Sequence, residues 1–193
     1  MCTYIVNSLS DTVTELALGG NDTVFSSVTF TLATAANVEN LTLTGGSAIN
    51  GTGNGENNIL IGNNGVNTLS GGAGDDILFG GLGADTLVGG AGTDTFLYTA
   101  LNQSPFNATN RDSIANFASG LDKIDLSALD ANTNVAGDQA FIFIGNAAFT
   151  AAGQVRYAGG MLQANVGGTN GNTADFSITL TGAPTFVATD MIA

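Results

Sequence analysis

A period of nine residues in the middle of the chain limits the possible folds more than any other feature of the sequence. Five units follow one another in unbroken register: GNGENNILI (53–61), GNNGVNTLS (62–70), GGAGDDILF (71–79), GGLGADTLV (80–88) and GGAGTDTFL (89–97). The last three match Gly-Gly-x-Gly-x-Asp-x-U-x at every defined position, where U is a large apolar residue. A fixed nonapeptide period of this kind is typical of a parallel β-helix.

Each unit joins a turn of six residues to a short strand. The U residue lies in the middle of the strand, so it should point inward while its two neighbours point outward. Because two units should make one coil, we expect one core column of Leu60, Leu78 and Phe96 and another of Leu69 and Leu87. A single coil cannot bury a core, so neighbouring coils must complete it.

The turns combine residues that suit a hard cation. Glycine permits the positive φ values of a sharp turn, backbone carbonyls then converge, and Asp at the sixth position adds a carboxylate. Ca²⁺ selects such oxygens, roughly six to eight of them. We therefore predict several Ca²⁺ ions, with these candidate ligands: Asn58, Gly65, Asn67, Gly72, Gly74, Asp76, Gly81, Gly83, Asp85, Gly90, Gly92 and Asp94.

Turns eighteen residues apart should lie one above the other and share a cation. The site between Asp76 and Asp94 should be the tightest, because two carboxylates meet there. Weaker sites are expected for the pairs Asn67–Asp85 and Asn58–Asp76, where Asn carries no charge. The alternative is that these turns bind no metal, since Gly, Asn and Asp also form ordinary turns.

The five units resemble the repeats of the RTX (repeats-in-toxin) family of calcium-binding proteins secreted by Gram-negative bacteria. The string DSIANFASGLDKIDLSALD (112–130) resembles the C-terminal module of serralysin-type metalloproteases and of alginate-epimerase R-modules. This resemblance implies an all-β fold, a parallel β-roll (β-helix solenoid) with rows of Ca²⁺ between turns. It also implies an extracellular protein that a type I secretion system exports by an uncleaved C-terminal signal, which the last residues, TDMIA, resemble.

The flanks of the array suggest three segments. Residues 1–52 alternate Thr, Ser and Val with apolar residues, which predicts irregular N-terminal rungs of the same solenoid or a polar cap over its first rung. Residues 53–97 are the nonapeptide β-roll, and residues 98–193 should form a C-terminal β cap that carries the secretion signal. Asp112, Asp122 and Asp125 could complete a further cation site, or this stretch could be only an amphipathic strand pair.

Composition excludes several classes of function. Of 193 residues, 16 are acidic and 3 are basic, a net charge of −13, so no nucleic-acid partner is expected. The chain has no His and one Cys, Cys2, which excludes His-based catalysis, His-ligated zinc and a disulfide framework. The apolar runs are too short for a membrane span, and no N-terminal signal peptide is expected.

Three functions remain. The first is a calcium-binding RTX module that folds on Ca²⁺ outside the cell and supports type I secretion of itself or of a parent protein. The second is a Ca²⁺-dependent adhesion module for an extracellular polysaccharide or a cell surface. The third is the C-terminal part of a secreted enzyme. Because neither H-E-x-x-H nor G-x-S-x-G is present, we expect no catalytic site in this chain itself.

Overall fold

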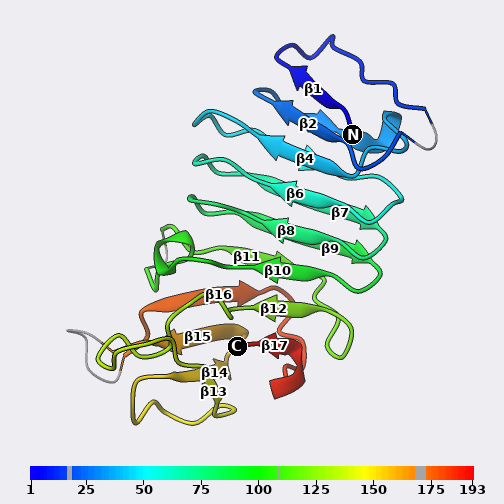
Figure 1. Cartoon of the computed structure of the whole chain (residues 1–193). Helices are drawn as coiled ribbons and strands as arrows, with labels where there is room; N and C mark the ends of the chain where they lie inside the picture. The colour runs from blue at the N-terminus through cyan, green and yellow to red at the C-terminus, as the bar shows by residue number, and fades with distance from the viewer. Residues whose placement is uncertain (17–18, 108, 168–172) are drawn as a thin grey trace.

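Between residues 23 and 143, successive strands of the chain alternate between two sheets that run side by side along a solenoid (Figure 1). The computed structural model describes all residues except 17–18, 108 and 168–172. Every neighbouring pair in the first sheet is parallel. Its eight described strands, in spatial order, are β1 (Thr3–Val6), β2 (Thr23–Ser26), β4 (Asn40–Leu43), β6 (Ile59–Ile61), β8 (Ile77–Phe79), β10 (Thr95–Leu97), β12 (Lys123–Asp125) and β17 (Met191–Ile192).

The second sheet is parallel along the roll and antiparallel near its C-terminal end. Its nine described strands, in spatial order, are β3 (Phe30–Thr31), β5 (Gly51–Thr52), β7 (Thr68–Ala73), β9 (Thr86–Ala91), β11 (Ser113–Ala115), β16 (Phe176–Leu180), β15 (Met161–Asn165), β14 (Gln154–Ala158) and β13 (Ile142–Phe143). The strands from β3 to β16 pair in parallel. β15 pairs antiparallel with both β16 and β14, so a meander closes this end of the roll.

Helical structure in the described residues is limited to one-turn 3₁₀ helices: η1 (Leu32–Thr34), η2 (Leu101–Gln103) and η4 (Ala188–Asp190). Within the described part of the chain, no helix has the length and apolar character that a membrane crossing requires.

The apolar U residues stack into two buried columns, as the period predicted. The first column consists of Val24, Leu41, Leu60, Leu78, Phe96 and Ile124, which face one another in register and have no exposed surface. The second consists of Leu69, Leu87, Ile114 and Leu180. Burying each such side chain contributes about 1.5–3 kcal/mol. The predicted all-β parallel roll is therefore confirmed.

The N-terminal flank continues the roll. β2 pairs with β4, and β4 pairs with β6, the first strand of the nonapeptide array. The described strands of residues 1–52 therefore belong to the same two sheets as the array, and their assignment as rungs or cap stays a prediction. Both sheets run through positions 52 and 97, so the predicted segment boundaries there stay a prediction.

An aromatic cluster fills the C-terminal end of the core. The ring of Phe186 lies 5.6 Å from Phe117, 5.6 Å from Phe143 and 5.4 Å from Tyr157, measured between ring centroids. Phe117 in turn lies 6.1 Å from Phe96, the last U residue of the array. Contacts of this kind contribute about 0.5–1.5 kcal/mol beyond area burial. The cluster therefore links the cap to the stacked core of the repeats.

Candidate metal centres

An acidic or amide residue directly precedes each strand of the first sheet after β1. In order along the roll these residues are Asp22, Glu39, Asn58, Asp76, Asp94, Asp122 and Asp190. The N–H of Asn58 donates to Asp76 Oδ1 at 2.8 Å, and the N–H of Asp76 donates to Asp94 Oδ1 at 3.0 Å. The same bond joins the N–H of Asp94 to Asp122 Oδ1 at 3.1 Å. We call this series the first ladder.

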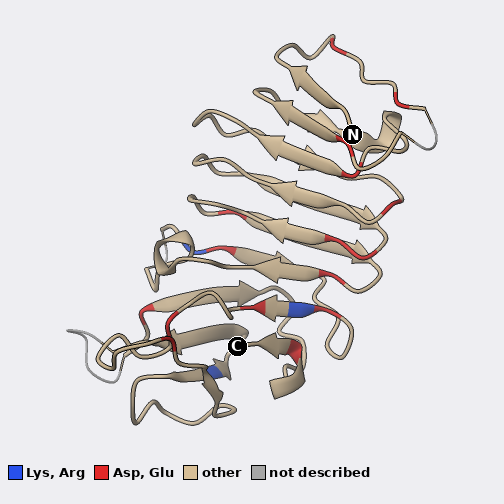
Figure 2. Ribbon diagram, viewed as in Figure 1, with Lys and Arg blue, Asp and Glu red and all other residues tan. Residues whose placement is uncertain are grey.

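A second ladder precedes the strands of the second sheet. The N–H of Asn67 donates to Asp85 Oδ1 at 2.8 Å, and the N–H of Asp85 donates to Asp112 Oδ1 at 2.8 Å. All three side chains are buried. Figure 2 shows acidic segments in the turns at both edges of the roll. The two ladders therefore place negative charge along two separate rows.

The other carboxylate oxygen of most ladder Asp residues has no hydrogen-bond partner. Among the described residues, this holds for Oδ2 of Asp22, Asp76, Asp85, Asp94 and Asp112. Of these, Asp112 lies beside the Tyr98 hydroxyl, which partly offsets the rise that burial causes in the pKa of Asp112. Asp122 differs, because its Oδ2 accepts the N–H of Ala118 at 2.8 Å. A buried polar atom without a partner costs about 1–3 kcal/mol, and more when it is charged. Each free Oδ2 could therefore take a proton or a cation.

Glycine lets backbone carbonyls approach these free oxygens. A Cβ on Gly71 would overlap both Asp76 Oδ2 and the carbonyl oxygen of Gly89 in the next rung. Gly90 has a φ of +125°, and its Cβ would overlap the carbonyl oxygen of Gly72. A side chain at these positions would fill the space in which carboxylate and carbonyl oxygens converge. Such oxygens form the ligand set of a hard divalent cation.

Burial raises the pKa of four ladder residues: Asp76, Asp85, Asp94 and Asp112. The pKa of Asp76 rises to about 7, first because burial disfavours its charged form and then because Asp94 and Asp75 add negative charge nearby. Burial likewise raises the pKa of Asp85 to about 7 and the pKa of Asp112 to about 8. A cation bound next to one of these carboxylates would favour its ionised form and lower its pKa.

These shifts predict how pH changes the stability of the metal-free chain. Because the pKa values of Asp76, Asp85 and Asp112 are higher in the folded state than in the unfolded state, the folded state binds more protons. This contribution is fully present below about pH 4 and is lost as the pH rises to about 8. We expect far-UV circular dichroism in chelator to show less β structure at pH 8 than at about pH 5. An identical spectrum at both pH values would contradict this expectation.

The pKa of Asp190 shifts in the opposite direction, so this residue makes the fold less stable at acidic pH than at neutral pH. Burial alone would raise its pKa, but hydrogen bonds from Ser119 Oγ, the Val187 N–H and the Gly120 N–H lower the pKa below the usual value. Its contribution to stability is therefore lost as the pH falls through the folded pKa.

The predicted ligands fall into two groups in the structure. The predicted pairs Asp76–Asp94, Asn67–Asp85 and Asn58–Asp76 lie in adjacent rungs, joined by the ladder bonds. Six predicted glycines have a positive φ, namely Gly72, Gly74, Gly81, Gly83, Gly90 and Gly92. Gly65 does not, and the carboxamide oxygens of Asn58 and Asn67 already accept a hydrogen bond. The assignment of all the predicted residues as calcium ligands stays a prediction.

The expected site formed by Asp112, Asp122 and Asp125 is wrong. Asp112 belongs to the second ladder and Asp122 to the first, because β11 and β12 lie in different sheets. Asp125 lies within β12, where its Oδ1 accepts the N–H of Ser127 at 2.9 Å and its hydroxyl at 2.7 Å. Sequence reasoning also missed Asp22, although it lies directly before a strand, as the Asp residues of the repeats do.

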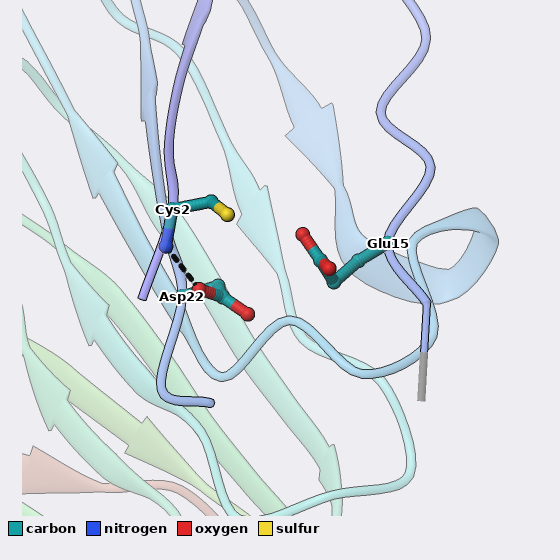
Figure 3. Close-up of side chains that lie close together, drawn as sticks. All are labelled: Cys2, Glu15 and Asp22. Atoms are coloured by element: carbon teal, nitrogen blue, oxygen red, sulfur yellow. Dashed lines mark hydrogen bonds between the residues drawn. The ribbon is translucent and has the colours of Figure 1, made fainter. Parts of the chain in front are cut away.

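The N-terminal end of the first ladder gathers three potential ligands (Figure 3). One ligand atom each of Cys2, Glu15 and Asp22 lies within 4.8 Å of the others. Asp22 is fully buried, its Oδ1 accepts the N–H of Cys2, and the Cys2 side chain is exposed. Asp22 thus repeats the arrangement of Asp76, with one carboxylate oxygen bound to the preceding rung and the other free.

Comparison with known proteins agrees with this geometry. The family model described as Peptidase M10 serralysin C terminal matches residues 9–193. The chain belongs to this family. This family and the fold described above support an RTX-type β-roll of the calcium-binding kind. The resemblance inferred from the repeats is therefore confirmed.

A solved structure and a search of curated proteins complete the comparison for this member of the serralysin C-terminal family. The solution structure of the AlgE6R3 subunit from the Azotobacter vinelandii mannuronan C5-epimerase is 24% identical, with a TM-score of 0.45. The match covers 80% of this chain and 77% of that one. No curated protein matches the chain.

Proposed function

We propose that this chain is a calcium-dependent folding module, in which Ca²⁺ bound along two rows of turns closes the roll outside the cell. The observation that carries the proposal is the repeated free Oδ2 of a buried Asp beside a glycine-rich turn. Bound Ca²⁺ would supply the positive charge that these oxygens lack. The turns would supply carbonyl and carboxylate oxygens, the ligands that Ca²⁺ prefers.

Four Asp residues would hold the ions. Asp76 and Asp94 serve the first row, and Asp85 and Asp112 serve the second, because each combines burial with a free Oδ2. Asp112 lies beyond the last nonapeptide, so the second row extends past the repeats into the C-terminal segment. Without a cation, these carboxylates must stay protonated or separate, and the turns cannot close at neutral pH.

Removing one carboxylate tests the assignment. We expect Asp76→Asn to weaken Ca²⁺ binding by about tenfold or more, since it removes a charged ligand oxygen. Isothermal titration calorimetry measures this affinity. Asp75→Asn is the matched control, because Asp75 is exposed in the same turn and the change in charge is equal. Equal calcium affinity in both variants would refute the role given to Asp76.

We also propose that export precedes folding. The C-terminal residues Met191–Ile192 form β17, which pairs with β12. Just before them, the Asp190 carboxylate accepts hydrogen bonds from Ser119 Oγ at 2.7 Å and the Gly120 N–H at 2.8 Å. A type I secretion signal in this segment would be accessible only in the unfolded chain, which low cytosolic calcium would maintain.

Deleting residues 189–193 tests this second proposal. We expect the deletion to abolish export from cells that carry a type I secretion system. Calcium binding by the purified variant, measured by calorimetry, should persist, because Asp76, Asp85, Asp94 and Asp112 are all retained. Undiminished export would place the signal elsewhere in the chain.

Polysaccharide binding gains no support from the basic side chains. The three of them are engaged within the molecule: Arg111 Nε donates to Ser177 Oγ at 2.8 Å, and Arg156 Nε donates to Gln163 Oε1 at 2.7 Å. Lys123 Nζ donates to a backbone carbonyl near the C-terminus at 2.8 Å. The net charge of −13 also opposes an anionic polymer. We therefore prefer the folding module over an adhesion module.

A further inference from the structure

The two nonapeptides that lack Asp at the sixth position also lack Gly at the second. Units 53–61 and 62–70 carry Asn at both positions, as the pairs Asn54–Asn58 and Asn63–Asn67. The other three units carry Gly and Asp there. The same double change in both units indicates that the two Asn side chains act together.

In the first of these turns, Asn54 and Asn58 form two hydrogen bonds with each other. The N–H of Asn54 donates to Asn58 Oδ1 at 2.7 Å, and Asn58 Nδ2 donates to Asn54 Oδ1 at 3.1 Å. Asn54 Oδ1 also accepts the N–H of Glu56 at 2.9 Å. Both carboxamide oxygens therefore have donors, whereas the corresponding turn at Asp76 leaves an oxygen free.

The carboxamide nitrogens bind carbonyl oxygens of the preceding rung. Asn54 Nδ2 donates to the carbonyl of Val38 at 2.9 Å and to that of Ala35 at 3.3 Å. Asn58 Nδ2 donates to the carbonyl of Glu39 at 3.2 Å. Carbonyl oxygens at a turn are ligands that a hard cation would take. In this turn, the carboxamide N–H groups hydrogen-bond to those carbonyl oxygens instead.

The second turn, which contains Asn63 and Asn67, repeats this circuit of hydrogen bonds. The N–H of Asn63 donates to Asn67 Oδ1 at 2.9 Å, and Asn67 Nδ2 donates to Asn63 Oδ1 at 3.0 Å. Asn63 Nδ2 then donates to the carbonyls of Thr44 at 3.1 Å and Ser47 at 3.0 Å. Asn67 Nδ2 donates to the carbonyl of Ile49 at 2.6 Å. Both Asn turns therefore contain the same set of hydrogen bonds.

The backbone conformation at the second position also differs between the Asp units and the Asn units. At the second position of the Asp units, Gly72, Gly81 and Gly90 have φ values of +115°, +92° and +125°. Asn54 and Asn63, at the equivalent position, do not have a positive φ. Their N–H groups are therefore free to donate to the sixth residue of their own turn, as the hydrogen bonds above record.

We propose that each Asn–Asn pair takes the place of a calcium ion, so that the rungs of residues 35–70 close without metal. The rungs from residue 71 onward then assemble on this metal-independent segment when calcium arrives. Only the calcium-dependent assembly of the rungs from residue 71 onward rests on the proposed function. The weaker calcium sites expected from the sequence at Asn58 and Asn67 are accordingly replaced by hydrogen bonds.

Hydrogen exchange of the unaltered chain tests the proposal directly. In chelator at neutral pH, the amides of β6 and of Thr68–Ser70 in β7 should exchange at least about tenfold more slowly than those of β10 and β12. Added Ca²⁺ should then slow β10 and β12. If β6 and β7 exchange as fast as β10 in chelator, the inference is overturned. If Ca²⁺ slows none of these strands, the proposed function itself fails.

Restoring the repeat motif tests the circuit itself. The variant Asn54→Gly/Asn58→Asp should bind one more Ca²⁺ per chain than the unaltered protein, as counted by native mass spectrometry, and should lose protection of β6 in chelator. Asn57→Asp is the matched control, since it adds the same charge to the same turn outside the circuit. It should leave the count unchanged.

An unchanged count in the folded double variant would overturn the inference. Asn63→Gly/Asn67→Asp provides the same test in the second turn, should the first variant not fold. The exchange experiment on the unaltered chain decides the question independently of both variants.

Discussion

Adding Ca²⁺ to the chelated chain at neutral pH is expected to raise its free energy of unfolding by about 11 kcal/mol. This figure assumes that Asp76, Asp85, Asp94 and Asp112 each serve one ion, present at 100 times its dissociation constant, which contributes about 2.7 kcal/mol per site. The total is comparable with the whole stability of a small domain, about 5–15 kcal/mol. Calcium should therefore decide whether the rungs after residue 70 are folded.

Urea unfolding followed by far-UV circular dichroism measures this effect, in chelator and in about 10 mM Ca²⁺, a level that saturates weak extracellular sites. Mg²⁺ is the control. It requires near-ideal octahedral geometry and releases its water reluctantly, so it should not replace Ca²⁺ in turns built from carbonyls. Equal urea midpoints with and without Ca²⁺ would remove the basis of the proposed function.

Replacing Phe96 with Ala should lower the free energy of unfolding by about 3–5 kcal/mol, because a large buried side chain is lost and leaves a cavity. Phe96 has no exposed surface and stacks between Leu78 and Ile124 in the first column. Its ring also lies 6.1 Å from Phe117, which joins the repeats to the aromatic cap. Urea unfolding in saturating Ca²⁺ measures the loss.

Thr95→Ala is the control for this substitution. Thr95 lies on the same strand, and its side chain alternates to the outer face, so the change should stay within about 0.5 kcal/mol. A loss below about 1 kcal/mol for Phe96→Ala would mean that the stacked column contributes little to holding the roll together.

The regular part of this fold could be predicted from sequence because its geometry is local. A turn and a strand fit within nine residues, so the period places Leu60 above Leu78 and Asp76 above Asp94 without knowledge of any distant contact. The same reasoning indicated a hard-cation site at each turn. It distinguished the Asn turns from the Asp turns by charge alone, because the hydrogen bonds of the Asn side chains involve carbonyls of residues 35–49, in rungs outside the array.

The sequence by itself therefore determined the parallel roll, its two core columns and the acidic turns of the repeats, all of which follow from short-range periodicity. Only the tertiary structure decided how the ladders continue beyond the repeats. Asp85 meets Asp112 after 27 residues and Asp94 meets Asp122 after 28, instead of the 18 that separate neighbouring rungs of the array. Loops of irregular length break the period, and strand pairing restores the contact because each exposed sheet edge must find a partner.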